Sequence, residues 1–191
     1  MANYNKAITA TSVRLGEVRF SYANVFAKRK NDDGSDGKYT VCLLIPKADA
    51  QAKKLIDAAV EAAKQAGVQS KWNGKLPSAA KLHLPLRDGD AECPDDPNYE
   101  GMWFMNAGST QKPGVRVLEN GAMHEALDSD DFYSGCWGAV VVNFFPYSVS
   151  GNVGVAAGLN NLIKTRDDDR FGGGRSADAD FGDMASGSFL D

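Results

Sequence analysis

The 191-residue sequence predicts a mainly β protein, a small Greek-key barrel of about five or six strands with one α-helix inserted after the second strand. Three observations carry this prediction. Stretches typical of strands follow one another along the chain, amphipathic helical spacing occurs once rather than as a repeat, and the composition changes after Arg166. We therefore divide the chain into a folded domain, residues 1–166, and a Gly- and Asp-rich acidic tail, residues 167–191, that we expect to be disordered.

The first two strands are expected at residues 11–26 and 39–46. Apolar residues of the first nearly alternate with polar ones, and a slip of phase at Gly16 indicates a bulge or bend. The residues placed on its apolar face are Val13, Leu15, Val18, Phe20 and Tyr22. The second, YTVCLLIP, predicts a buried strand that ends at proline. A polar loop rich in turn formers separates the two strands.

The helix is expected within residues 47–67, where apolar residues recur at helical spacing and charged residues occupy the other face. Asp49 is the expected N-cap and Gly67 the expected C-terminal stop. The following residues, up to about 100, are irregular and contain four prolines. Further strands are predicted from the segments GMWFMNAGS, GVRVLEN, GCWGAVVVNFFPYSV and GNVGVAAGLNNLIKTRDD.

Several protein classes are excluded or disfavoured. No apolar run reaches the roughly 18 residues that cross a bilayer, and the N-terminus lacks the basic-then-apolar order of a secretory signal, so we expect a cytoplasmic protein. Sequence motifs of P-loop, dinucleotide-binding, serine-hydrolase and zinc-protease sites are absent. The cysteines and histidines show no zinc-ligand spacing. We expect free thiols, no catalytic residues, no cofactor and no metal.

The net charge of −4 conceals a strong asymmetry along the chain. Residues 1–87 hold 15 Lys and Arg against 7 Asp and Glu, whereas residues 88–166 hold 4 against 11, and residues 167–191 hold 2 against 7. This separation predicts a basic surface for a polyanion and an acidic tail. The alternative is that folding interleaves the blocks and leaves no basic patch.

Single-stranded nucleic acid is bound by cations that follow the phosphates and by aromatic rings that stack on bases. Cations cluster in the predicted loops, and Trp72 lies between two lysines in a turn-forming loop. Aromatic residues within strands serve either the core or the groove, and alternation alone does not decide which. The candidate nucleic-acid-binding residues are Lys28, Arg29, Lys30, Lys71, Trp72, Lys75, Trp103, Lys112, Arg116, Trp137, Tyr147 and Lys164.

Residues 130–174 resemble the C-terminal half of a bacteriophage family of single-stranded DNA-binding proteins, first known as an uncharacterised domain family and typified by an enterobacterial phage protein. The matching segments are FYSGCW, NFFPY, GNVGVAAGLNNLIKTRD and the Gly-rich exit. VRLGEVRFSYANVFAKR, YTVCLLIPK and the helix that follows resemble the family's N-terminal half. The resemblance implies an OB-fold with an inserted helix that binds single-stranded DNA during phage replication, recombination or repair, in the host cytoplasm.

The resemblance also implies a disordered acidic tail. From the residues of this tail we expect that it modulates DNA binding and recruits replication or recombination proteins. The tail residues given these roles are Asp178, Asp180, Asp183, Phe189, Leu190 and Asp191. The carboxylates would occupy the cationic groove as a weak mimic of DNA, and the Phe–Leu pair would enter an apolar pocket of a partner. The ending SFLD departs from the Pro-Phe ending of the bacterial cellular proteins.

Two alternatives stay open. In the first, the chain is a structural or adaptor protein that acts mainly through its tail. In the second, it is a metal-dependent nuclease built on the acidic residues of 88–96 and 128–131. The first alternative predicts partner capture that depends on the tail and no DNA binding by the folded domain. The sequence leaves open whether the chain forms a homo-oligomer.

Overall fold

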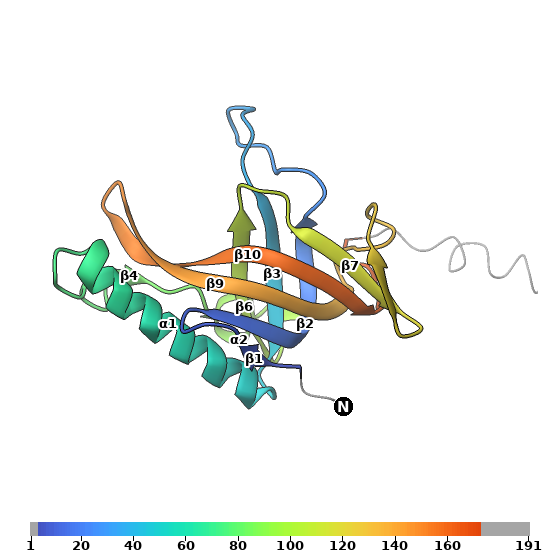
Figure 1. Cartoon of the computed structure of the whole chain (residues 1–191), viewed down its shortest axis with the longest axis horizontal. Helices are drawn as coiled ribbons and strands as arrows, with labels where there is room; N and C mark the ends of the chain where they lie inside the picture. Colours follow the sequence, from blue (N-terminus) through green and yellow to red (C-terminus); the bar gives the residue numbers. More distant parts are fainter. Residues whose placement is uncertain (1–3, 173–191) are drawn as a thin grey trace, which may run out of the picture.

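The centre of the protein is a closed barrel of five strands. The computed structural model describes residues 4–172. The barrel strands are β2 (Ser12–Asn24), β3 (Tyr39–Pro46), β6 (Met102–Ser109), β9 (Trp137–Val149) and β10 (Asn152–Arg166). They pair in the order β6-β3-β2-β9-β10, and a parallel pairing of β10 with β6 closes the barrel. This arrangement, shown in Figure 1, is an OB-fold, as predicted.

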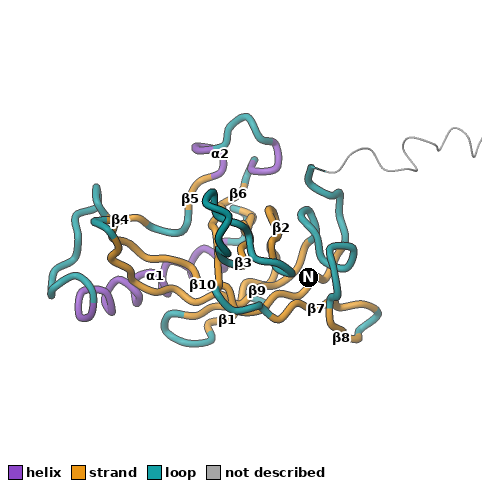
Figure 2. Tube along the Cα trace, turned by 90° about the horizontal axis from the view of Figure 1, so that it is seen from above, coloured by secondary structure: helices purple, strands orange, loops and turns teal. Residues whose placement is uncertain are grey.

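Shorter elements surround the barrel. β1 (Lys6–Ala7) pairs with β2, β4 (Leu82–His83) with β10, and β5 (Arg87–Asp88) with β6. β7 (Gly114–Glu119) pairs with β10 and forms a hairpin with β8 (Ala122–Glu125). The remaining elements are α2 (Gly89–Glu92) and the 3₁₀ turn η1 (Pro97–Tyr99). Figure 2 shows β5 and α2 set to one side of the barrel.

β2 contains two irregularities that decide which of its residues face the core. The register with β9 shifts between Leu15 and Val18, as the predicted bulge at Gly16 requires. A second shift, in the pairing with β3, lies between Ser21 and Asn24. Phe20 is therefore fully buried, whereas Tyr22 is 69% exposed. The prediction that Tyr22 shares the apolar face was wrong, because the second bulge reverses the alternation.

The helix α1 (Ala50–Ser70) lies beneath the long β9–β10 hairpin (Figure 1). Its N-cap is Asp49, as predicted, and the Asp49 carboxylate accepts a hydrogen bond of 2.9 Å from the amide of Ala52. The predicted stop at Gly67 was wrong, because the helix continues for three residues. Gly67 has a packing role instead, since a Cβ atom there would lie 2.5 Å from the ring of Trp72.

Trp72 belongs to the hydrophobic core. Only 7% of its surface is exposed, and its Nε1 donates a hydrogen bond of 3.1 Å to the carbonyl oxygen of Tyr147. The ring thereby joins the end of α1 to the β9–β10 hairpin. This burial argues against the expected role of Trp72 in base stacking, because a base cannot reach the face of a buried ring. Lys71 and Lys75, on either side of it in the sequence, are exposed.

A second, smaller apolar cluster lies outside the barrel, on the outer face of β3 and β6. It consists of Cys42, Leu44, Tyr99 and Phe104. Alternation along β6 is as expected, because Met105 is in the main core while Phe104 is in this outer cluster. Residues 89–101 cover one end of the outer face and leave the other end open. Among residues 4–172, no helix is both long and apolar enough to span a bilayer.

We predict that Trp72→Ala lowers the free energy of unfolding by about 3 kcal/mol or more, because it opens a cavity between α1 and β9. Lys71→Ala, next to it but exposed, is expected to change this free energy by less than about 0.5 kcal/mol. Urea denaturation of both variants measures the difference. Equal stability of the two variants would contradict the core position of Trp72.

Candidate nucleic-acid interface

A groove runs along the outer face of β3 and β6. Its volume is about 640 Å³, and it is lined by Tyr22, Asn24, Arg29, Thr40, Val41, Cys42, Tyr99, Phe104 and Asn106. Two further hollows adjoin it. A hollow of about 640 Å³ in the β2–β3 loop shares Arg29 and Thr40 with the groove, and one of about 210 Å³ beside η1 shares Tyr22 and Tyr99. Together they form one elongated depression across the barrel.

Tyr22 is the exposed aromatic residue of this groove. Its backbone φ is +47°, in the left-handed region that residues other than glycine seldom adopt. The bulge between Ser21 and Asn24 holds this conformation and turns the ring away from the core. Strained backbone of this kind is concentrated at functional sites. An exposed ring beside a groove is what base stacking requires.

The inner surface of the groove is aromatic and uncharged. The rings of Tyr99 and Phe104 meet edge to face, with their centroids 5.1 Å apart. Burial raises the pKa of the Tyr99 phenol and that of the nearby Cys42 thiol. Both groups therefore remain neutral at physiological pH. The guanidinium of Arg87 lies 4.6 Å from the centroid of Phe104, at the edge of this aromatic surface.

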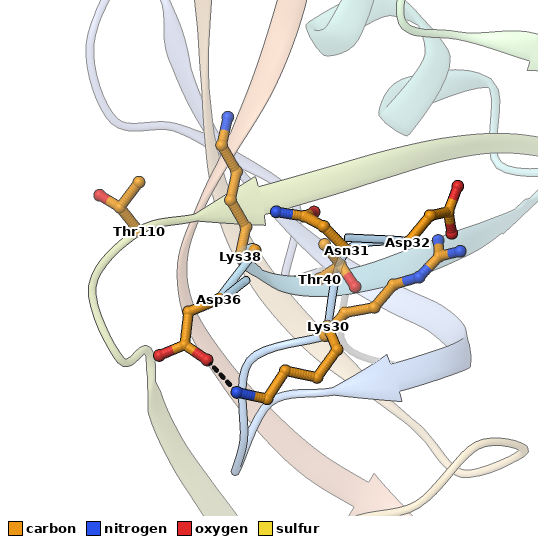
Figure 3. Close-up of a pocket in the computed structure, with 9 residues that line it drawn as sticks. Lys30, Asn31, Asp32, Asp36, Lys38, Thr40 and Thr110 are labelled. Atoms are coloured by element: carbon orange, nitrogen blue, oxygen red, sulfur yellow. Dashed lines mark hydrogen bonds and ion pairs between the residues drawn. The ribbon is translucent and has the colours of Figure 1, made fainter. Parts of the chain in front are cut away.

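The β2–β3 loop carries the cations at the other end of the depression. Lys30 forms an ion pair with Asp36, which lowers the pKa of that carboxyl group (Figure 3). Lys38 extends away from this pair in Figure 3. Among residues 4–172, neither Arg29 nor Lys38 forms an ion pair, so both cations are available to a phosphate. Lys28 lies 6.0 Å from the ring of Tyr39.

Residues 167–172, expected to begin the disordered tail, are packed against the barrel instead. The amide of Phe171 donates a hydrogen bond of 2.9 Å to the carbonyl oxygen of Ser134. Tyr133 donates through its hydroxyl to Asp167, 2.7 Å away, and Trp137 donates through Nε1 to Asp168, 2.8 Å away. The folded part therefore extends at least to Gly172. The predicted tail-function residues, 178–191, lie outside the described residues.

In this packing, two of the predicted nucleic-acid-binding residues already have partners within the protein. Lys164 is buried and forms a 2.7 Å ion pair with Asp167. Trp137 lies beneath the guanidinium of Arg166, 4.7 Å from the ring centroid, and bonds to Asp168. Burial, together with the hydrogen bond to Asp167, raises the pKa of Tyr133 to about 12.

The other predicted residues are scattered. Lys71 and Lys75 line a separate hollow of about 520 Å³ beside the β9–β10 hairpin. The ammonium groups of Lys47 and Lys53 lie 4.7 Å and 5.3 Å from the Trp103 ring. The rest are Lys112 in the β6–β7 loop, Arg116 in an ion pair with Glu125, and Tyr147 in β9. The structure thus brings Arg29 and Lys30 to the depression and places most of the others elsewhere.

Several groove residues were missed by sequence reasoning. Tyr22 was assigned to the core, and Tyr99 lies in a segment that looked irregular. Phe104 and Asn106 follow strand alternation, but the sequence does not show which face of β6 is the groove. The local sequence gives no usable signal for Tyr22, since the strand ends Phe-Ser-Tyr-Ala-Asn and the polar Ser21 is buried while Tyr22 is exposed.

The acidic stretches have structural roles. Asp88 caps α2, and Asp96 caps η1. Asp88 and Asp90 both form ion pairs with Lys47. Asp130 forms an ion pair with Arg170. Within residues 4–172, no group of three or more His, Cys, Asp or Glu side chains is placed to hold a metal ion. The described thiols of Cys42, Cys93 and Cys136 are free.

We predict that Asp167 makes the folded state sensitive to acid. The hydrogen bond from Lys164, reinforced by that from Tyr133, lowers the pKa of Asp167. Its contribution to stability is therefore present above the unfolded-state pKa and is lost as the pH falls below about 4. Asp167→Asn should be less stable than the wild type at pH 7 and lose less stability between pH 5 and pH 3.

Urea denaturation across this pH range is the measurement, and Asp95→Asn is the control, because Asp95 is exposed and forms no ion pair in the described part of the chain. An acid sensitivity of Asp167→Asn equal to that of the wild type would count against the assigned contact.

Comparison with known proteins agrees with the barrel fold. The family described as Enterobacter phage Enc34, ssDNA-binding protein matches residues 11–189. The solved structure of the single-stranded DNA-binding protein from bacteriophage Enc34 in complex with ssDNA has a TM-score of 0.77 at 26% identity, over 90% of this chain and 96% of that chain. Another structure of the Enc34 protein has a TM-score of 0.72 at 27% identity, over 94% of each chain.

The single-stranded DNA-binding protein gp2.5 of bacteriophage T7 has a TM-score of 0.58 at 15% identity, over 86% of this chain and 97% of that chain, and so shares the fold. No curated protein matches the chain significantly. The family match spans most of the sequence and confirms the resemblance seen in its motifs. The chain therefore belongs to the Enc34 family of phage single-stranded DNA-binding proteins.

Proposed function

We propose that this protein binds single-stranded DNA without sequence preference, along the outer face of β3 and β6. The observation that carries the proposal is the groove itself, with Tyr22 exposed at its edge and unpaired cations in the adjoining β2–β3 loop. OB-folds bind oligonucleotides on the face of their second and third strands and with the loop between the first two. In this barrel the second and third strands along the chain are β3 and β6. The likeness to the Enc34 protein, which was solved in complex with ssDNA, supports the binding of single-stranded DNA.

The groove is suited to single strands of any sequence. Rings such as Tyr22 can stack on any base, while Arg29 and Lys38 can contact phosphates, which carry no sequence information. The whole chain has an isoelectric point of about 5.2, so attraction for DNA must be local. Because Asp88, Asp90, Asp167 and Asp168 are each paired with a cation, these carboxylates repel a phosphate less than unpaired ones would.

The proposal places the protein in phage DNA replication, recombination or repair, in the cytoplasm of the infected host. There it would cover exposed single strands without catalysing a reaction. The tail beyond residue 172 would recruit replication or recombination proteins. In the rival adaptor hypothesis, this recruitment is the whole function and the barrel does not bind DNA.

A fluorescence anisotropy titration with labelled oligo-dT tests the proposal. We expect binding at 50 mM salt that weakens steeply as salt rises, with a logarithmic slope of about −0.7 for each phosphate contact. Oligo-dA and mixed sequences should bind with similar affinity. An absence of binding at low salt, by the full chain and by residues 1–175 alike, would refute the proposal and favour the adaptor hypothesis.

Within this site, we predict that Tyr22→Ala weakens oligo-dT binding by about 1–3 kcal/mol, the usual contribution of one base stacked on an aromatic ring. Tyr22→Phe should retain most of the affinity, because the ring is kept. Leu127→Ala, at a highly exposed position away from the groove, is the control. Unchanged binding by a folded Tyr22→Ala variant would remove Tyr22 from the interface.

We further predict that deletion of residues 176–191 tightens oligo-dT binding at low salt. The deletion removes four carboxylates and so the proposed competitor for the cationic surface. The same titration measures the change, with a full-length variant carrying Asp→Asn at Asp178, Asp180, Asp183 and Asp191 as a test of charge alone. Equal or weaker binding after deletion would contradict the DNA-mimic role.

A further inference from the structure

Most glycines within the described strands have structural reasons. At Gly16, Gly138 and Gly154 a Cβ atom would come closer than 3.0 Å to backbone atoms, and at Gly114 and Gly158 it would come that close to an asparagine side chain. At Gly16, for example, it would lie 2.7 Å from the Cβ of Tyr4. Close packing against a neighbouring chain segment therefore explains these glycines.

Gly108, in β6, has no such reason. A Cβ atom built there would meet its nearest neighbours at 3.5 Å or more, which is ordinary van der Waals contact. Its φ lies outside the left-handed region that favours glycine. The pairing of β6 with β3 is regular over Met102–Ser109, so Gly108 does not form a bulge either. Glycine destabilises a strand interior relative to alanine. The fold alone would therefore accept a side chain here.

The position of Gly108 offers a different reason. It pairs with Thr40 on one side and with Gly158 on the other. Because side chains alternate between faces, Gly108 lies on the outer face together with Asn106, while Ala107 between them is in the core. Thr40 lines both the groove and the hollow of the β2–β3 loop. Gly108 therefore lies beside the point where these two depressions meet.

On the side of β10, Gly108 adjoins Gly158, which is buried, with the amide group of Asn143 close to its Cα position. The nearest outer-face residue farther along β10 is Ala156. Ala156 pairs with Phe145 of β9, whose ring is 40% exposed. Phe145 is therefore a second exposed aromatic ring on the outer face, two strands away from Gly108.

We propose that Gly108 is a contact point for the bound strand, where a nucleotide lies directly against the backbone of β6 on its way from the β2–β3 loop towards Phe145. This inference rests on the proposed function and deepens it, because it assigns the path of the strand across the barrel. Glycine suits this position because a larger side chain would occupy the place of the nucleotide. A bare backbone position of this kind is a recognised mark of close ligand approach.

Graded substitution tests the inference. Gly108→Ala should keep or slightly raise the melting temperature and bind oligo-dT within about two-fold of the wild type, because a methyl group fills little of the space. Gly108→Val should weaken binding by about ten-fold or more, the loss expected when one nucleotide contact is displaced. Ala122→Val, at an exposed position of β8, is the matched control for added bulk and should bind as the wild type does.

A second measurement does not depend on the folding of the variants. In ¹⁵N-glycine-labelled wild-type protein, oligo-dT should shift the amide resonance of Gly108 and leave that of Gly121, in the β7–β8 turn, unchanged. Wild-type affinity of a folded Gly108→Val variant, or an unmoved Gly108 resonance during saturating titration, would overturn the inference while leaving DNA binding intact. Failure of the wild type to bind would instead refute the proposed function.

Discussion

The parallel pairing of β6 with β10 is the contact on which the arrangement of the protein depends. It joins Ala107 to Ala157 and Gly108 to Gly158, and so closes five strands into a barrel. Inside, the two alanines occupy the core with Met105 and Leu159. Outside, Gly108 puts no side chain over the backbone of β6, whereas Gly158 is buried beside Asn143. One pairing therefore completes the core and also places Gly108 at the edge of the proposed DNA site.

Two departures from regular strand geometry shape the rest of the site. The bulge between Ser21 and Asn24 moves Tyr22 from the core side to the outer face, at the cost of a strained backbone. Residues 89–101 cover the outer cluster of Cys42, Leu44, Tyr99 and Phe104 at one end only. The groove is what remains uncovered. Its affinity for DNA would thus come from a local arrangement of rings and cations within an acidic protein.

The packed segment 167–172 holds two of its three carboxylates against the barrel. Asp167 is bound by Lys164 and Tyr133, and Asp168 by Trp137 and Arg19. These two groups are paired within the protein and so are poorly placed to compete with DNA. The packed segment also fixes where the tail leaves the barrel, beside the hollow that contains Phe171 and Tyr22.

The sequence by itself determined the class of fold, the single helix with its Asp49 cap, the bulge at Gly16 and the family, because each depends on local periodicity or on contiguous motifs. Only the tertiary structure decided which aromatic residues face solvent. Trp72 has the local signature of a surface residue, yet α1 and β9 bury it, and Tyr22 has the signature of a core residue, yet a bulge exposes it. Likewise, the exposure of Gly108 depends on β3 and β10, which are remote in sequence. Burial is set by contacts between distant segments, and strand alternation cannot anticipate them.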